Sequence, residues 1–337
     1  MKDDRPDPSP DAPVAGEPLG APLGRAPGPA SAPSAASAPR PAPRGPAVFC
    51  LGGAHWDMVG RPSGPLAPGG DMPGRMIRRP GGVALNLALA FAALGRPTVL
   101  AAPVGRDPEG ASLAARLSAR GVSLRRMGPE APTGLYLAIE DGAGGLAAAV
   151  ADLPGCEGAA PEHLRPVLTP TAANAAAWVL EANLPEPTLA AVVAAHAALP
   201  AGARPWLVAN PASPARAARL GGLLGALDLL ICNRAEAEAL TGRRFAEAAE
   251  AAAALRAFGL REAVVTDGPA PAACADADGV VARIPLPAPP EPSLLMATGA
   301  GDALFAAFLD ARLRGEDGAQ ALEAGLRAAR ARMETLT

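Results

Sequence analysis

The chain has 337 residues and carries 30 Lys and Arg residues against 33 Asp and Glu residues, which gives a net charge of −3. That balance and an aromatic content of 3% exclude a basic surface with interleaved aromatic rings for nucleic acid. Arg, Glu, Pro or Gly interrupts every Ala-rich stretch, so no apolar run is long enough to span a membrane. Lys2 is the only lysine, and a cationic phosphate clamp must therefore be arginine or backbone.

The first 46 residues hold 13 of the 40 prolines and almost no large apolar residue. Such a segment buries too little surface to offset its ordering entropy, so residues 1–46 are expected to be a disordered tail. A signal peptide needs a continuous apolar segment, which is absent here. Four aspartates argue against an organellar transit peptide, namely Asp3, Asp4, Asp7 and Asp11.

Short apolar segments alternate with helical segments from residue 47 onward. The expected strands cover residues 47–51, 98–104, 178–182, 206–209, 227–232 and 263–266, with an edge strand at 280–285. This alternation predicts a doubly wound, mostly parallel α/β sheet with helices on both faces. Ligands of such a sheet collect at the carboxyl ends of its strands.

Residues 133–153 interrupt that alternation. Leu135, Leu137 and Ile139 alternate with less apolar residues, and a glycine-rich turn at 141–145 precedes a second extended run. The pattern predicts an inserted β-hairpin, and residues 55–80 are expected to contribute to the same small lid. A lid excludes water from a reaction, but the same hairpin also suits a clasp between two copies of the chain.

Polar residues at three helix starts have alternative explanations. Asn86 lies on an otherwise apolar helix and needs a partner, which is either a backbone group or a bound hydroxyl. Asp107 follows Gly105 in a turn and is expected to cap a helix rather than to catalyse a reaction. Asn233 and Glu236, three residues apart at another helix start, have the spacing of a capping box.

The segment Thr298-Gly299-Ala300-Gly301-Asp302 comes directly before a strongly helical run. Its small residues allow a tight turn that points backbone N–H groups outward, and a helix start adds partial positive charge. Such a terminus binds an anion, usually phosphate. Asp302 is then either an ordinary helix cap or a base that takes a proton from an attacking hydroxyl.

The glycines at 81 and 82 with Asn86, and the Gly-Ala-Gly-Asp segment at 299–302, resemble the two signatures of the ribokinase-like (PfkB-type) kinases. The resemblance extends from residue 47 to about residue 334. It implies an ATP-dependent kinase domain over residues 47–337, in which Asp302 is the general base. The amides of Gly299, Ala300 and Gly301 would form the anion hole.

The same resemblance implies roles for further residues. The sugar side would comprise Asp57, Gly81, Gly82 and Asn86, and the nucleotide side Asn233, Thr266, Gly268 and Thr298. In the family, the Asn-x-x-Glu segment orders Mg²⁺ through water, which implies that Glu236 does so here. Met296 stands where the family has an aspartate that helps to bind a monovalent cation, so K⁺ activation is in doubt. Asn210 also replaces a usual aspartate.

Loop sequences at 133–141, 149–152 and 180–185 are similar to the pseudouridine kinase branch of this family, although Glu181 replaces an aspartate. This similarity implies phosphorylation of the 5′-hydroxyl of pseudouridine, with Tyr136 and Asn183 on the substrate side. A kinase for ribose, fructose or another nucleoside is the first alternative. A non-catalytic regulatory protein on the same fold is the second.

The cysteines and histidines are scattered along the chain. None of them forms a pair at metal-ligand spacing, which argues against a structural zinc. Two of the cysteines lie in expected strands and are expected to be buried thiols in a cytoplasmic protein. The residues are Cys50, Cys156, Cys232 and Cys274, with His55, His163 and His196.

Overall fold

The computed structural model describes residues 45–66, 69–141, 145–277, 279–285 and 299–334. The expected tail therefore lies almost wholly outside the described residues, as do Met296 and Thr298. No helix in these ranges is long and apolar enough to cross a membrane.

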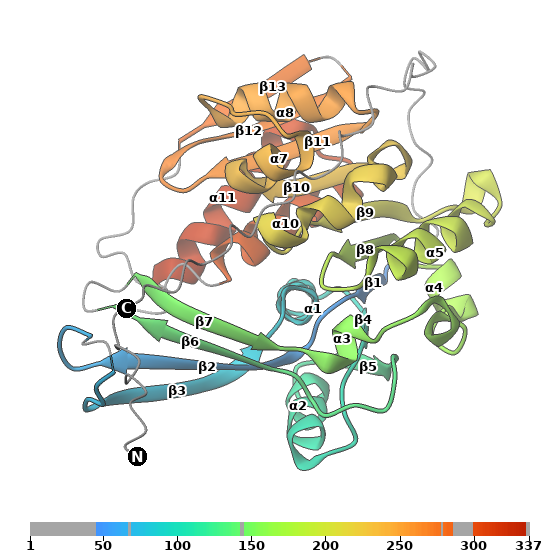
Figure 1. The fold of residues 1–337 in the computed structure, drawn as a ribbon. Coiled ribbons are helices and arrows are strands. Elements are labelled where there is room, and N and C mark those ends of the chain that lie inside the picture. Colours follow the sequence, from blue (N-terminus) through green and yellow to red (C-terminus); the bar gives the residue numbers. More distant parts are fainter. Residues whose placement is uncertain (1–44, 67–68, 142–144, 278, 286–298, 335–337) are drawn as a thin grey trace, which may run out of the picture.

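A nine-stranded sheet forms the centre of the molecule (Figure 1). Its strand order is β13-β12-β11-β10-β9-β8-β1-β4-β5, and all neighbours are parallel except for the antiparallel pairs β11–β12 and β12–β13. The predicted doubly wound, mostly parallel sheet is thus confirmed. The strands are β1 (Val48–Leu51), β4 (Thr98–Ala102), β5 (Val122–Arg126), β8 (Ala177–Glu181), β9 (Trp206–Asn210), β10 (Leu229–Asn233), β11 (Glu262–Asp267), β12 (Ala270–Asp276) and β13 (Gly279–Ile284).

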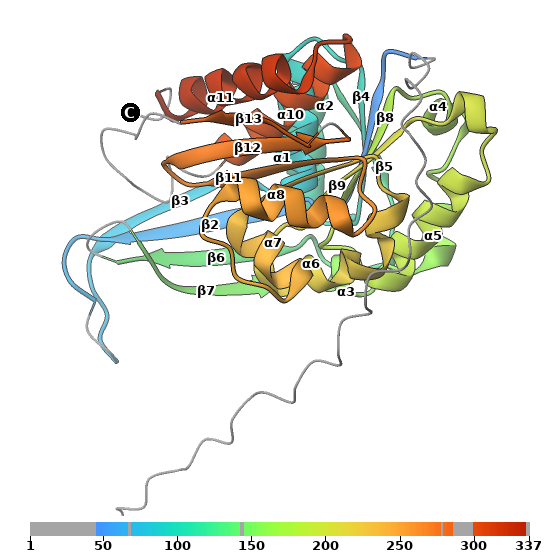
Figure 2. The same ribbon diagram turned by 90° about the horizontal axis from the view of Figure 1, so that it is seen from above.

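Helices cover both faces of this sheet (Figure 2). One buried cluster joins one face to α1 (Val83–Ala93), α2 (Pro108–Ser118), α10 (Ala300–Leu313) and α11 (Gly318–Glu334). The second cluster joins the other face mainly to α5 (Glu186–Ala197), α7 (Arg234–Thr241) and α8 (Ala248–Ala257). The short helices are α3 (Pro154–Glu157), α4 (Pro170–Ala173) and α6 (Pro214–Ala217), with 3₁₀ turns at Pro161–Leu164, Ala201–Ala203 and Ala218–Ala226.

Four strands form a second, smaller sheet, the lid, in the order β3-β2-β6-β7. It combines the hairpin β2 (His55–Pro62) and β3 (Gly74–Gly81) with the hairpin β6 (Leu135–Glu140) and β7 (Leu146–Asp152). The two hairpins pair in parallel through β2 and β6, and the Arg61 Nε donates to the buried Glu140 Oε2 at 2.6 Å. The lid lies below α10 and α11 in Figure 1.

The helix starts show why these segments fold as they do. Asp107 caps α2, because its Oδ1 accepts a hydrogen bond from the Gly110 N–H at 2.7 Å, and the predicted cap is confirmed. Its Oδ2 also accepts from the Thr133 N–H and so ties α2 to the segment before β6. Gly82 precedes α1 with a φ of 97°, a conformation that a side chain disfavours.

Candidate active site

The start of α10 presents an open turn of backbone. Gly299 adopts the left-handed conformation with a φ of 86°, and the helix begins at Ala300. The first N–H groups of a helix have no partner within it, so they remain available to an anion. Gly301 is exposed, and a Cβ atom at that position would meet no other atom within 4 Å. The geometry of this turn therefore suits the predicted anion hole.

Asp302 lies in the first turn of α10, beside this open backbone. The residue as a whole is half-buried, but burial of its carboxyl group raises its pKa to about 7. A hydrogen bond from Asn86 opposes that rise, the negative charges of Glu181 and Glu236 add to it, and the positive charge of Arg332 opposes it. A carboxyl group with this pKa exchanges protons near neutral pH, as a general base must.

The structure gives Asn86 a partner that the sequence did not suggest. The Asn86 side chain lies close enough to the Asp302 carboxyl group to lower its pKa. A bound hydroxyl as a further partner of Asn86 stays a prediction. Asn86 lies on α1 and Asp302 on α10, and both helices belong to one buried cluster. The two signature segments are therefore in direct contact.

Asp57 lies in strand β2 and is only 8% exposed, so the alternative of a solvated loop residue is wrong. Its Oδ1 lies 3.3 Å from the His55 Nε2, and its Oδ2 lies 3.6 Å from the Arg79 Nε. Gly81 passes directly over the Asp57 carboxylate, where a Cβ atom would collide with it. Tyr136 is next to Asp57 in the register of β2 and β6. Burial, and to a lesser extent the negative charge of Asp57, raises the pKa of the Tyr136 hydroxyl.

The Glu181 carboxylate joins the loop after β1 to the loop after β8. It is completely buried at the end of β8. Its Oε2 accepts from the Gly53 N–H at 2.7 Å, and its Oε1 accepts from the Asn183 N–H at 2.8 Å. The Asn183 side chain accepts in turn from Arg216, so part of its hydrogen-bonding capacity is already used within the protein. The sequence marked Glu181 only as a departure from the family pattern.

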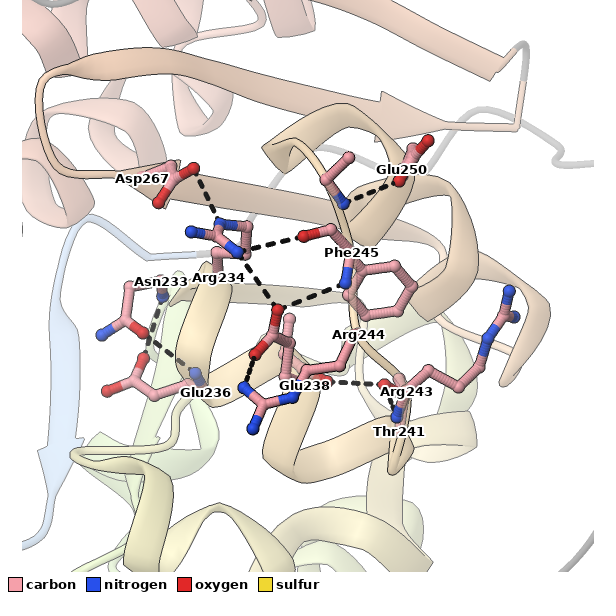
Figure 3. A network of polar contacts seen from close by, with 12 residues as sticks. Asn233, Arg234, Glu236, Glu238, Thr241, Arg243, Arg244, Phe245, Glu250 and Asp267 are labelled. Atoms are coloured by element: carbon pink, nitrogen blue, oxygen red, sulfur yellow. Dashed lines mark hydrogen bonds and ion pairs between the residues drawn. The ribbon is translucent and has the colours of Figure 1, made fainter.

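The described residues predicted for the nucleotide side lie around a hollow of about 560 Å³. The predicted residues Asn233, Thr266 and Gly268 all line it. Arg234 also lines the hollow and contacts two of its acidic residues (Figure 3). Its Nε donates to Asp267 Oδ2 at 2.7 Å, and its Nη1 donates to Glu238 Oε1 at 3.2 Å. The remaining lining residues are Ala235 and Arg244, together with Arg234, Glu238 and Asp267. Arg234, the first residue of α7, thus ties the end of β11 to that helix.

Asn233 and Glu236 form the capping box that their spacing indicates (Figure 3). The Glu236 N–H donates to Asn233 Oδ1, and the Asn233 N–H donates to Glu236 Oε2, both at 2.9 Å. Burial raises the pKa of Glu236, and the negative charge of Glu236 in turn raises the pKa of Asp302. The cap uses Oε2, and neither of these bonds uses Oε1. A capping role therefore does not preclude a role toward a metal ion.

Two arginines at this site were not predicted from the sequence. Arg79 lies on β3 beside Asp57. Arg332 lies near the end of α11, and a Cβ atom on residue 299 would be 3.3 Å from its Nε. Only the pairing of β2 with β3 and the packing of α11 on α10 place these residues here. The local sequence carries no signal for either contact.

The family of the chain follows from a comparison with known proteins. Residues 47–335 match the pfkB family carbohydrate kinase model. The chain belongs to the pfkB family of carbohydrate kinases. It is accordingly a phosphotransferase that acts on an alcohol group of a sugar or nucleoside, and members of this family use ATP as the phosphoryl donor.

Individual relatives agree with this family. The chain is 28% identical over 264 residues to pseudouridine kinase of Escherichia coli strain K12, covering 77% of this chain and 81% of the relative. A carbohydrate kinase structure from Agrobacterium tumefaciens is 32% identical with a TM-score of 0.70, covering 84% of this chain and 89% of its own. A ribokinase structure from Thermotoga maritima is 21% identical with a TM-score of 0.68, covering 84% and 91%, and supports the fold alone.

The pKa of Asp302 leads to a prediction for the pH dependence of turnover. A base must lose its own proton before it can accept one from a hydroxyl. Because the pKa of Asp302 is about 7, kcat/KM should fall roughly tenfold per pH unit below that value and level off above it. Initial rates between pH 5.5 and 8.5 at constant ionic strength test this. A rate that does not change across that range would contradict the assignment.

Proposed function

We propose that the protein transfers the γ-phosphoryl group of ATP to the 5′-hydroxyl of pseudouridine, with Asp302 as the general base. The observation that carries the reaction type is the pairing, on one helix start, of open backbone N–H groups with a carboxyl group whose pKa is about 7. The similarity to a pseudouridine kinase supports the substrate. Family membership favours an enzyme over the regulatory alternative.

In the proposed reaction, the acceptor hydroxyl gives its proton to Asp302. The hydroxyl oxygen forms a bond to the γ-phosphorus as the bond between that phosphorus and the β–γ bridging oxygen breaks, and ADP leaves. The amides of Gly299, Ala300 and Gly301 donate to the phosphoryl oxygens. Asp57 holds a second hydroxyl of the sugar, and Asn86 orients the base through its hydrogen bond to Asp302.

A divalent ion fits the carboxyl group of Glu236. The group is buried near Asp302, and neither bond of the capping box uses its Oε1. Mg²⁺ binds few carboxylates and keeps several waters, so one such group reaching it through water is sufficient. When bound, Mg²⁺ would neutralise charge on the phosphates. Asn233 and Glu236 would hold it on the nucleotide side.

Glu236→Gln is expected to raise the Mg²⁺ concentration needed for half-maximal rate by about tenfold, because it removes the negative charge. Glutamine can replace glutamate in a capping box, so α7 should remain intact. Rates measured across a Mg²⁺ titration at saturating ATP test this prediction. Glu250→Gln is the matched control, since Glu250 also accepts a backbone N–H, from Ala246, but on the surface. Equal Mg²⁺ requirements in both variants would exclude Glu236 from the proposed magnesium site.

The substrate is tested by measuring ADP release with ATP, Mg²⁺ and a panel of acceptors. Turnover confined to pseudouridine, rather than uridine, ribose or fructose, would support the proposed substrate. Turnover on another sugar would keep the kinase and exclude pseudouridine. Repeating the panel with and without K⁺ tests the effect of Met296, which lies outside the described residues.

We also propose that the lid contacts a second copy of the chain. Its strands expose apolar side chains, among them Leu135, Leu146 and Val150, of which Val150 is 64% exposed. Burying such residues between two lids would stabilise a homodimer. Sedimentation of the protein and of Val150→Asp tests this, and a monomer at all concentrations would exclude it.

The thiols bear on the proposed cytoplasmic location. All four cysteines are free and buried, and burial raises the pKa of each thiol. Buried, protonated thiols suit a reducing compartment. Fractionation of cells that express the protein would test the location.

A further inference from the structure

Strand β2 presents Asp57, which is proposed above to hold a sugar hydroxyl, on one face and Trp56 on the other. Successive side chains of a strand point to opposite faces, and the register of β2 with β3 places Arg79 beside Asp57. Arg78 therefore lies on the same face as Trp56. Trp56 is only 4% exposed although it belongs to the lid. Another part of the fold must therefore cover this face of the lid.

The first turn of helix α2 covers that face. The Trp56 indole Nε1–H donates to the backbone carbonyl of Glu109 at 3.1 Å. The Arg78 guanidinium lies 4.0 Å from the centre of the Trp56 ring and forms an ion pair with the Glu109 carboxylate. A cation over the face of a tryptophan ring is attracted to it. Glu109 thus binds β2 through its backbone and β3 through its side chain.

The same turn also holds the second hairpin of the lid. Asp107, the cap of α2, accepts hydrogen bonds from the Thr133 N–H at 2.7 Å and from the Thr133 hydroxyl at 2.6 Å. Thr133 leads into β6, and the Gly134 carbonyl accepts from the Trp56 N–H at 3.0 Å. Both hairpins are therefore attached to one helical turn, at the end of the lid where β2 and β6 begin.

The contacts of Glu109 differ in strength. The side chains of Arg78 and Glu109 are 42% and 50% exposed, and an ion pair between such exposed groups contributes little. The Trp56 side chain is buried, and a buried N–H group that loses its acceptor is costly. The bond from the indole of Trp56 is therefore expected to be the stronger attachment.

We infer that Trp56 is a positioning residue for the acceptor, because its attachment to α2 holds β2 where Asp57 meets the acceptor hydroxyl. This inference rests on the proposed function, in which Asp57 binds the acceptor. Trp56 and Asp57 are consecutive in a paired strand, so a displacement of the indole also displaces the carboxylate. Arg78 and Glu109 act through Trp56 in the same way, and neither needs to touch the acceptor.

The kinetic test compares Trp56→Phe, Arg78→Gln and the control Arg75→Gln, whose arginine is exposed on the same strand as Arg78. Trp56→Phe keeps an aromatic ring but removes the indole N–H, and should raise KM for the acceptor about three- to tenfold. Arg78→Gln should raise it about two- to threefold, because its ion pair is exposed. In each variant kcat and the dissociation constant of Mg·ADP should stay within about twofold of wild type. Arg75→Gln should match wild type.

Amide hydrogen exchange tests the attachment without any reaction. The amides of β2 and β3 should exchange about tenfold faster in Trp56→Phe than in wild type, because the hairpin opens more often. The amides of β1 and β8 in the main sheet should keep their wild-type rates. A residue that only stabilised the whole fold would speed exchange in both sheets and would not raise KM while kcat stays constant.

Other results would overturn the inference. An unchanged KM for the acceptor in Trp56→Phe would remove Trp56 from acceptor positioning, and so would a lowered kcat with an unchanged KM. Exchange that is faster in both sheets would assign Trp56 a role in global stability alone. If the wild type phosphorylates no acceptor, the proposed function fails and exchange alone decides on the attachment. Faster exchange confined to the lid strands would then support it, and wild-type exchange in Trp56→Phe would refute it.

Discussion

Asp302→Asn is expected to slow phosphoryl transfer by about 10²–10⁴-fold, which is the usual contribution of a positioned general base. The amide has nearly the same shape as the carboxyl group but cannot take a proton from the acceptor hydroxyl. Neither the turn at Gly299 nor the first-turn N–H groups of α10 depend on that charge. The dissociation constants of acceptor and nucleotide should therefore stay within about threefold of wild type.

The experiment measures single-turnover rates together with equilibrium binding of acceptor and Mg·ADP. Asp317→Asn is the control, because Asp317 is an exposed aspartate at the start of the next helix, α11, where its Oδ1 accepts from the Gln320 N–H. The pH dependence below about 7 should disappear in Asp302→Asn and persist in Asp317→Asn. A variant that turns over at a near-normal rate would remove Asp302 from the mechanism.

Glu181→Ala is expected to lower the free energy of unfolding by about 2–5 kcal/mol, because it leaves two buried N–H groups without an acceptor. Those groups belong to Gly53 and Asn183, which lie on the loops that follow β1 and β8. The variant should also raise KM for the acceptor, since the loop after β1 leads directly into the strand that carries Asp57.

Denaturant unfolding of the variant and of Glu162→Ala measures this effect, since Glu162 is an exposed glutamate in the same domain. Glu181→Gln gives an internal check. Its amide oxygen can accept one of the two hydrogen bonds, but its NH₂ group faces the second N–H and cannot accept it. An intermediate loss of stability is expected. A loss below about 1 kcal/mol in Glu181→Ala would show that water replaces the carboxylate.

The sequence was sufficient to predict the fold class because most strands of the main sheet are short apolar runs ended by polar residues or glycine. The edge strand β5 (Val-Ser-Leu-Arg-Arg) and β12 were not predicted. The sequence was also sufficient to predict the β6–β7 hairpin of the lid and that residues 55–80 belong to the lid, but not that residues 55–81 form a second hairpin. It did not predict that β2 and β6 join them into one sheet, since that pairing joins strands far apart in the chain. For the same reason Asp57 could be taken for a loop residue.

The candidate site was predictable where its residues lie in local sequence patterns. The turn at 299–302 and the Asn233–Glu236 spacing carry their own signals. Arg332, Arg79 and the buried carboxylate of Glu181 carry none, because their positions depend on how α11, β3 and β8 pack. The sequence also could not show that Asn86 contacts Asp302, which required the packing of α1 on α10.

That packing has a consequence for the order of synthesis. Helix α1 contributes Leu85 and Phe91 to a buried cluster that also contains Phe305 and Phe308 of α10. A ribosome makes α1 early and α10 near the end of the chain. Until then the apolar face of α1 lacks its α10 partners, and the residue proposed to start the reaction does not yet exist. A chain released before α10 is made would thus be inactive and prone to aggregate, and chaperones and proteases would bind it readily.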